Sequence, residues 1–262
     1  MEIRGRSCIV TGASSGIGAA TARHLHALGA NVTLAARRTD RIEALAAELP
    51  GTRAVTTDVT HPDDLRCLIF ETVNTFGSID VLVNNAGQGL HVPILELDPI
   101  DLRAVFELNV VAPLVATQYV LPAMVAAGGG AIVNVSSATT LRVFPGVGGY
   151  AATKAALNML SDVSRVELAD KGVVVSVVYP RVTDTEFHQS LRAGVGPSGR
   201  SIPKDPPELV AEAIEFAITS GEAHVLVDET PTAIGPTAGP ERTPASRSVR
   251  PSRAESGERA SM

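Results

Sequence analysis

The sequence predicts a doubly wound α/β fold, with a parallel sheet covered by helices on both faces. Short apolar segments alternate with helix-like segments along most of the 262 residues. Several apolar segments are continuously hydrophobic, as strands buried on both faces are. A glycine-rich turn follows the first of them. Such alternation builds a sheet from successive right-handed strand–helix–strand units.

The spacing of apolar residues predicts seven strands, at 7–11, 31–36, 53–57, from 81 to 83, 131–135, 173–179 and 224–227. Helices are expected between them, at 17–28, 39–49, 62–76, 99–127, 150–168 and 207–219. Gly29 suits the end of the first helix, and Pro50-Gly51 closes the second. Pro113 and Pro122 are expected to kink the long helix at 99–127.

Composition divides the chain into one domain, residues 1–229, and a tail, residues 230–262. The tail is rich in Pro, Arg and Ser and has few large apolar residues, so we expect it to be disordered. It holds five Arg and three Glu, which leaves 17 basic and 25 acidic residues in the domain. A domain with a net charge of −8 disfavours nucleic acid as a partner.

The two cysteines, Cys8 and Cys67, show no disulfide-like pattern and are expected to be buried free thiols. The N-terminus lacks the apolar core of a signal peptide, and no apolar stretch is expected to reach the roughly 18 residues of a membrane span. The sequence therefore predicts a cytoplasmic protein with no membrane partner. No metal site is predicted.

Tyr150 and Lys154 form a candidate proton-transfer pair. They are four residues apart in a helical segment, so their side chains share one face, about 5–6 Å apart at Cβ. A phenol has an ordinary pKa of roughly 10, and a nearby ammonium favours the phenolate. Taken alone, the pair is better explained as two ordinary residues of an amphipathic helix.

The glycine-rich turn lies between the first strand and the first helix. A pyrophosphate must approach the backbone closely at this place, and the helix N-terminus offers N–H donors to it. The position, the first strand–helix junction of a doubly wound sheet, is where Rossmann-type folds bind dinucleotides. The candidate nucleotide-binding residues here are Gly12, Ser14, Ser15, Gly16, Ile17 and Gly18.

Together these motifs resemble the short-chain dehydrogenase/reductase family in its single-domain form, from about residue 6 to residue 228. Thr11-Gly12-x-x-x-Gly16-x-Gly18 is similar to the glycine motif of the family, and Asn84-Asn85-Ala86-Gly87 to its second motif. The resemblance identifies a catalytic tetrad in matching order and spacing: Asn109, Ser137, Tyr150 and Lys154.

The resemblance implies a role for each member of the tetrad. Tyr150 would exchange the proton with the substrate oxygen, and Lys154 would lower the pKa of Tyr150 and bind the nicotinamide ribose. Ser137 would donate a hydrogen bond to the same oxygen, and Asn109 would hold a water that connects Lys154 to solvent. Ser136 competes with Ser137, but the spacing to Tyr150 favours Ser137.

The cofactor is expected to be NADP(H), in preference to NAD(H). By resemblance, the acid that accepts the ribose 2′-hydroxyl in NAD enzymes falls at Ala36, which is neutral. Arg37 and Arg38 follow at once, and a guanidinium suits a 2′-phosphate. The alternative is that both are ordinary surface arginines.

The resemblance supplies further cofactor contacts. Asp58 and Val59 resemble the pair that holds the adenine. Asn85, Ala86 and Gly87 resemble the wall beside the adenosine ribose, although a strand-ending turn would also explain them. The segment that contacts the nicotinamide contributes Pro180, Thr183 and Thr185. Arg181 departs from the family, which commonly has Gly there, and would bring a long cation near the reactive end of the cofactor.

The substrate, a small carbonyl or alcohol, is not identified. Residues 186–205 match the variable substrate lid, where His188 has a weak claim to contact substrate, as His91 has elsewhere. A β-ketoacyl carrier-protein reductase is an alternative within the enzyme class. A catalytically silent nucleotide-sensing or scaffold protein is the alternative outside it. The resemblance implies a homodimer or homotetramer through the helices at 99–127 and 150–168.

Overall fold

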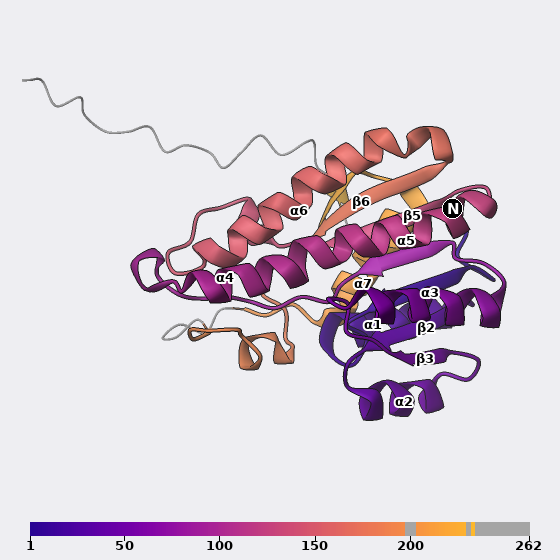
Figure 1. Cartoon of the computed structure of the whole chain (residues 1–262), viewed down its shortest axis with the longest axis horizontal. Helices are drawn as coiled ribbons and strands as arrows, with labels where there is room; N and C mark the ends of the chain where they lie inside the picture. The colour runs from indigo at the N-terminus through magenta and orange to yellow at the C-terminus, as the bar shows by residue number, and fades with distance from the viewer. Residues whose placement is uncertain (197–202, 229–231, 234–262) are drawn as a thin grey trace, which may run out of the picture.

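The sheet is the centre of a three-layer α/β structure (Figure 1). The structure, a computed structural model, describes residues 1–196, 203–228 and 232–233. The strand order is β3-β2-β1-β4-β5-β6-β7-β8. The strands are β1 (Ser7–Thr11), β2 (Asn31–Ala36), β3 (Arg53–Thr56), β4 (Val81–Asn84), β5 (Gly130–Val135), β6 (Val173–Tyr179), β7 (His224–Leu226) and β8 (Thr232–Ala233).

The seven predicted strands are all present and parallel. The eighth, β8, pairs antiparallel with β7, Ala233 opposite Val225. The sheet thus continues for two residues into the tail that the sequence predicted to be disordered. The remainder of that tail lies outside the described residues.

Helices cover both faces of the sheet, because each strand–helix–strand connection crosses one face. Residues of α1, α2 and α7 join the apolar cluster on one face, and residues of α3 and α5 join the cluster on the other. The helices are α1 (Gly16–Ala27), α2 (Thr39–Glu48), α3 (Pro62–Phe76), α4 (Pro99–Phe106), α5 (Ala112–Ala126), α6 (Gly148–Glu167) and α7 (Pro207–Ser220).

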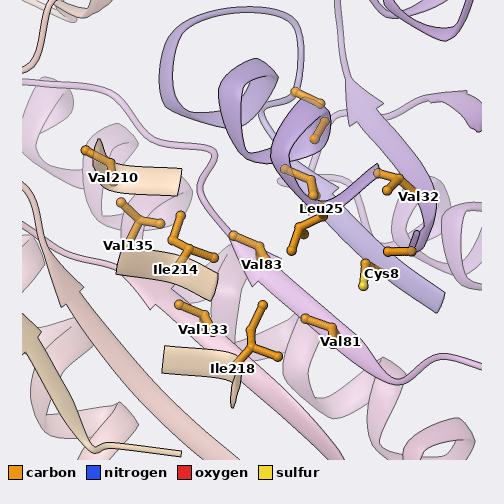
Figure 2. Close-up of a cluster of buried hydrophobic side chains, with 14 of the residues drawn as sticks. Cys8, Leu25, Val32, Val81, Val83, Val133, Val135, Val210, Ile214 and Ile218 are labelled. Atoms are coloured by element: carbon orange, nitrogen blue, oxygen red, sulfur yellow. The ribbon is translucent and has the colours of Figure 1, made fainter. Parts of the chain in front are cut away.

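Strand side chains alternate between the two clusters, as the pleat of a sheet requires. Val81 and Val83 face α1 and α7, whereas Leu82 between them faces α3 and α5. Figure 2 shows the first cluster, in which Ile214 and Ile218 of α7 lie over the strands. All five side chains are fully or almost fully buried. The paired clusters hold the strand ends, and the turns that follow them, in fixed positions.

The predicted helix at 99–127 is interrupted, but not at its prolines. A π-helical turn, Glu107–Val111, separates α4 from α5, and the N–H of Ala112 bonds to the carbonyl of Glu107. Pro122 lies within α5, which continues past it. Pro113 has no N–H to donate to the carbonyl of residue 109, as a regular helix would require. The interruption therefore falls at the residue the sequence marked as catalytic, Asn109.

Over Pro99–Ala126 the chain is long and apolar enough to cross a membrane, by length and composition alone. The expectation that no stretch reaches that length was therefore too strict. Helices in the cores of soluble proteins meet the same criterion, so the finding is weak evidence for a membrane span.

The cysteines differ in exposure. Cys8 is buried in β1, and burial raises the pKa of its thiol to about 12. Cys67 is exposed, contrary to the expectation. Its helix, α3, buries the stripe formed by Leu65, Leu68 and Thr72, and Cys67 lies outside that stripe.

Candidate active site

The predicted site residues meet at the carboxyl edge of the sheet. The glycine turn follows β1, the second motif follows β4, Ser137 follows β5, and the segment from Pro180 follows β6. Ligands of open α/β sheets bind at this edge, where the strand order reverses. The reversal lies between β1 and β4.

The glycine turn is too tight for side chains. Gly12 and Gly16 have φ of +67° and +53°, a region that disfavours other residues. A Cβ on Gly18 would lie 2.3 Å from the carbonyl oxygen of Gly12, and one on Gly12 would lie 2.9 Å from Cα of Ala86. Ile17 packs against the core beneath. The turn therefore presents bare backbone at the N-terminus of α1, which fits a pyrophosphate.

The second motif is held against this turn by Thr11. Its Oγ1 accepts hydrogen bonds from the N–H groups of Asn85 (3.0 Å) and Ala86 (3.1 Å). The Asn85 amide donates back to the carbonyl oxygen of Thr11, at 2.9 Å. The motif thus ends β4 and fixes the glycine turn. Thr11 belongs to the predicted glycine motif, but the sequence does not predict this role for it.

A polar stripe on α6 docks that helix on the end of β5. Lys154 Nζ donates to the Val135 carbonyl oxygen at 2.8 Å. One turn later, Asn158 Oδ1 accepts from Ser136 Oγ at 2.6 Å. Both contacts are buried, where polar groups without partners would be costly. They fix the rotation and register of α6 and so the position of Tyr150, one turn before Lys154.

A third buried contact continues the stripe. Ser161 Oγ accepts from Asn134 Nδ2 at 2.8 Å, and Asn134 Oδ1 accepts from Asn84 Nδ2 at 2.8 Å. The chain of contacts therefore links α6 to β5 and then to β4. None of these three residues was predicted to position the catalytic helix, although Asn84 lies in the second motif.

Ser136 and Ser137 have different partners, which favours Ser137 as the serine that faces substrate. Ser136 is committed to Asn158, behind the site. Ser137 Oγ accepts from the N–H and the hydroxyl of Thr139, at 3.2 and 3.0 Å, and interacts with the Tyr150 phenol.

The pKa of Tyr150 moves in the direction opposite to that expected from the sequence. Burial raises the pKa of the phenol to about 12, and the hydrogen bond with Ser137 opposes that rise. Lys154 Nζ lies 5.9 Å from the centre of the Tyr150 ring, and burial lowers the pKa of Lys154 from 10.5 to about 8. Loss of hydration outweighs the attraction that the sequence suggested, so at neutral pH Tyr150 keeps its proton.

Asn109 is buried in the π-helical turn and braces the second motif. Its Oδ1 accepts from the Gln88 N–H at 2.9 Å, and its Nδ2 donates to the Gln88 carbonyl oxygen and to Thr153 Oγ1, each at 3.0 Å. A Cβ on Gly87 would lie 3.1 Å from Asn109 Oδ1 and 3.5 Å from Lys154 Nζ. Gly87 thus lies where Asn109 and Lys154 converge.

The two arginines after β2 have different surroundings. Arg37 is largely exposed, and its nearest carboxylate, Asp58, is 3.9 Å away. Arg38 donates from Nε and Nη2 to Ser14 Oγ, at 3.0 and 2.8 Å, and from Nη2 to Ser15 Oγ at 2.6 Å. Arg38 is therefore part of the glycine turn, whereas Arg37 projects from the edge.

Asp58 and Val59 lie beside Arg37 at the end of β3. Burial alone would raise the pKa of Asp58, but hydrogen bonds from the side chain and N–H of Thr60 lower it below its ordinary value. Val59 is buried in the core. Asp58 is thus a carboxylate at neutral pH, placed beside the cation at the edge of the site.

The segment after β6 returns to the glycine turn. Thr185 lies against Gly16, where a Cβ would come within 2.8 Å of Thr185 Cγ2. Thr183 Oγ1 donates to the Arg181 carbonyl oxygen at 3.1 Å, and the Pro180 carbonyl oxygen accepts from the Ala138 N–H at 2.9 Å. These contacts bring the predicted nicotinamide segment to the strand ends.

Arg181 is paired with two carboxylates, and its expected position near the reactive end of the cofactor stays a prediction. Its Nε and Nη2 donate to the two carboxylate oxygens of Asp205, at 2.9 and 3.0 Å, and Nη1 donates to Asp228 at 2.8 Å. Thr183 and Asp205 also form a bridge between their backbones. Arg181 therefore joins the two ends of the lid at its base.

Aromatic rings from the lid and from the loop after β4 cover Tyr150. Phe187 lies 5.6 Å from the Tyr150 ring and His91 lies 6.1 Å from it, centre to centre. His188 lies 5.6 Å from His91, and neither of its ring nitrogens has a hydrogen-bond partner within the described residues. The sequence supports neither histidine strongly as a substrate contact, because it does not show which distant segments of the chain meet at a helix.

The pKa values of both imidazoles are lowered from the ordinary value of 6.5, so both rings are uncharged at neutral pH. Burial, and then the neighbouring His188, lower the pKa of His91, while burial and then Lys204 lower the pKa of His188. Leu90 and Val105 complete an apolar cluster with Tyr150. The described residues contain no group of three His, Cys, Asp or Glu side chains suited to a metal ion.

Comparison with known proteins agrees with this geometry. The sequence profile described as short chain dehydrogenase matches residues 6–196. An uncharacterized oxidoreductase of Staphylococcus aureus (strain N315) is 34% identical over 223 residues, which cover 84% of this chain and 94% of that protein.

Two solved structures are similar as well. A short-chain dehydrogenase from Streptomyces avermitilis is 31% identical, with a TM-score of 0.75, over 85% of this chain and 88% of that one. A 3-ketoacyl-(acyl-carrier-protein) reductase from Brucella melitensis, complexed with NADH, is 26% identical, with a TM-score of 0.78. The match covers 86% of this chain and 98% of that one. The chain belongs to the short-chain dehydrogenase/reductase family of oxidoreductases.

Proposed function

We propose that this protein reduces a carbonyl compound, or oxidises the corresponding secondary alcohol, with NADP(H) as cofactor. The observation that carries the proposal is the approach of Tyr150, Ser137, Lys154 and Asn109 to one another at the carboxyl edge of the sheet. Beside them, the glycine turn leaves room for backbone contact with a pyrophosphate. The residues present therefore fit a bound dinucleotide.

When bound, the nicotinamide cofactor supplies the hydride. Tyr150, protonated at neutral pH, donates its proton to the substrate oxygen during reduction. Ser137 donates a hydrogen bond to that oxygen and stabilises the negative charge that develops there. In the reverse direction Tyr150 would have to lose its proton first, and its raised pKa opposes this.

Lys154 and Asn109 support the proton transfer. The Lys154 ammonium stabilises the phenolate that remains after Tyr150 has given up its proton. The carbonyl of Asn109 lacks the helical donor that Pro113 would otherwise supply, which supports its role in holding a water beside Lys154. Lys154 is also proposed to bind the nicotinamide ribose.

The two arginines and the neutral Ala36 support NADP(H) over NAD(H). A 2′-phosphate prefers a guanidinium, and an acid at position 36 would repel it. Two cations lie at this edge, one exposed and one bound to the glycine turn. Asp58 and Val59 are proposed to hold the adenine, and Asn85, Ala86 and Gly87 the adenosine ribose. Pro180, Thr183 and Thr185 are proposed to contact the nicotinamide.

The residues around Tyr150 support a neutral, partly apolar substrate. Two uncharged imidazoles and Phe187 offer weak hydrogen bonding and apolar contact. The similar 3-ketoacyl-(acyl-carrier-protein) reductase keeps a carrier-protein thioester as an alternative substrate. A catalytically silent nucleotide-binding protein is the alternative of another class. A panel of ketones, aldehydes and quinones assayed with NADPH tests these choices, and turnover of any of them excludes the silent role.

Replacement of Tyr150 by Phe is expected to reduce turnover by roughly a hundredfold to ten-thousandfold, the usual contribution of a positioned proton donor. Removal of one hydroxyl leaves the ring packing and the nucleotide cradle in place, so NADPH affinity should change little. Steady-state kinetics and fluorescence titration measure the two effects. Tyr119→Phe, on α5, is the matched control, and substantial activity in Tyr150→Phe would contradict the assignment.

Reduction is expected to slow as the pH rises through about 8, because Lys154 loses its positive charge there. The sign for stability is opposite. Since burial lowers the pKa of Lys154, the unfolded chain binds a proton between about pH 8 and 10.5 that the folded chain has released, so the folded state gains stability over that range. This role for Lys154 would be excluded if the pH–rate profile is flat to pH 10 and the temperature of thermal unfolding does not change over the same pH range.

Replacement of Arg37 by Ala is expected to weaken NADPH binding roughly tenfold, the loss of one charge-assisted hydrogen bond, and to leave NADH binding unchanged. Titration calorimetry with both cofactors measures the difference. Lys171→Ala removes an exposed cation at the opposite edge of the sheet and serves as control. Equal activity with NADH and NADPH in the natural protein would rule out the preference.

We also propose a homodimer or homotetramer formed through α5 and α6. Met159, Val163 and Val166 lie exposed along one side of α6, at 63%, 45% and 79%. Light scattering of Val166→Asp is expected to show a smaller species than the natural protein, because a buried charge destabilises an apolar interface. Val143→Asp changes an equally exposed valine outside these helices and should leave the assembly intact. A monomeric natural protein would refute the proposal.

A further inference from the structure

Glu186 lies between two guanidinium groups at the edge of the cofactor site. It begins the short helix Glu186–Gln189 of the lid. Its carboxylate accepts from Arg38 Nη1 at 2.9 Å, and both of its oxygens accept from Arg41 Nη1 at 2.8 Å. Hydrogen bonds from Arg41, and then from Arg38, lower the pKa of Glu186. The group at this position is therefore an anion.

The same Arg38 belongs to the glycine turn through its bonds to Ser14 and Ser15. Three of its nitrogens, Nε, Nη1 and Nη2, thus donate to groups of the chain itself. A crevice of about 460 Å³ lies alongside, between α1 and the lid, and is lined by Ser14, Ser15, Gly16, Thr185 and Glu186 among others. An anion that enters at this edge meets Arg38 with a carboxylate already bound to it.

Carboxylate and phosphate oxygens both accept short, charge-assisted hydrogen bonds from a guanidinium. Two anions that share one cation repel each other. The repulsion is strongest when both lie within a few ångströms, well inside the screening length of physiological salt. A 2′-phosphate that reaches Arg38 must therefore displace Glu186 or bind close to it. Either event weakens the binding of the phosphate.

We propose that Glu186 is an internal competitor of the cofactor 2′-phosphate for Arg38 and Arg41, and so a residue that sets cofactor specificity. This inference rests on the proposed function, in which the arginines after β2 receive that phosphate. It gives the lid a part in the choice between NADP(H) and NAD(H), since only the phosphorylated cofactor competes with a lid residue.

The position of Glu186 in the lid gives the competition a second consequence. The next residue, Phe187, packs on the ring of Tyr150 at 5.6 Å. Release of Glu186 by a 2′-phosphate loosens the tie between this short helix and α2, which bears Arg41. The ion pair between Glu186 and Arg41 then no longer helps to hold Phe187 against the Tyr150 ring.

The competing explanation is that Glu186 forms an ordinary surface ion pair. Exposed pairs of this kind contribute little to stability, and such a pair would not discriminate between nucleotides with and without a 2′-phosphate. Removal of the carboxylate distinguishes the two explanations. Under the competition, affinity for the phosphorylated nucleotide rises, whereas a structural tie predicts unchanged or weaker binding.

The test is titration calorimetry of Glu186→Gln with 2′,5′-ADP and with 5′-ADP, which differ in the 2′-phosphate. We expect the variant to bind 2′,5′-ADP roughly fivefold to tenfold more tightly than the natural protein, with a smaller gain at high salt. Binding of 5′-ADP should stay within about twofold of the natural value, because it lacks the 2′-phosphate that competes with Glu186 for Arg38 and Arg41. Glu212→Gln, an exposed glutamate of α7, is the matched control, and thermal unfolding checks that each variant is folded.

The outcomes separate this inference from the proposed function. If the natural protein prefers 2′,5′-ADP and Glu186→Gln brings no gain, the competition is refuted and the NADP(H) preference stands. If the natural protein has no preference and the variant acquires one, the competition is supported and the NADP(H) preference is wrong. If neither protein prefers 2′,5′-ADP, both are refuted.

Discussion

The hydrogen bond from Lys154 to the Val135 carbonyl is the constraint on which the catalytic geometry depends. It places an ammonium in the interior, where the group loses hydration, and the carbonyl at the end of β5 compensates in part. The pairs Ser136–Asn158 and Asn134–Ser161 continue the same contact along α6. Because directional bonds at successive turns fix both rotation and register, Tyr150 is brought to Ser137 by the packing of a helix on a strand.

The same burial decides the protonation states. The site that holds Lys154 makes its ammonium easier to deprotonate, and the site that holds Tyr150 makes its phenol harder to deprotonate. The two shifts move the pKa values apart, from 10.0 to about 12 for Tyr150 and from 10.5 to about 8 for Lys154, and both groups still keep their protons at neutral pH. The result is a protonated phenol beside a cation, a pair suited to giving a proton to a developing alkoxide. The proposed proton transfer therefore depends as much on the exclusion of water as on the attraction between the two groups.

Sequence predicted what depends on local geometry and strand order. The glycine turn, the seven parallel strands and the four-residue spacing of Tyr150 and Lys154 follow from φ angles, apolar periodicity and helical pitch. It failed where the outcome depended on contacts between distant segments. The sign of the Tyr150 pKa shift depends on how completely the site is buried, and the partners of Arg181 lie 24 and 47 residues away. The sequence predicted kinks at the prolines, whereas the helix is interrupted at Asn109. A proline signals a missing N–H without showing where the helix adjusts.

Arg38 is a further residue whose partners, contributed by distant segments, the sequence does not predict. Its partners bear on the cofactor specificity. A pair of arginines after the second strand is a signal for a 2′-phosphate only if the guanidinium groups are available to it. Glu186 lies 148 residues along the chain from Arg38, and no pattern in the sequence connects the two. Specificity is a difference between two affinities, and a carboxylate that opposes the phosphorylated cofactor acts on that difference as directly as a cation that favours it. Under the proposed competition, the choice of cofactor depends on the balance between Arg37, Arg38 and Arg41 on one side and a lid carboxylate on the other.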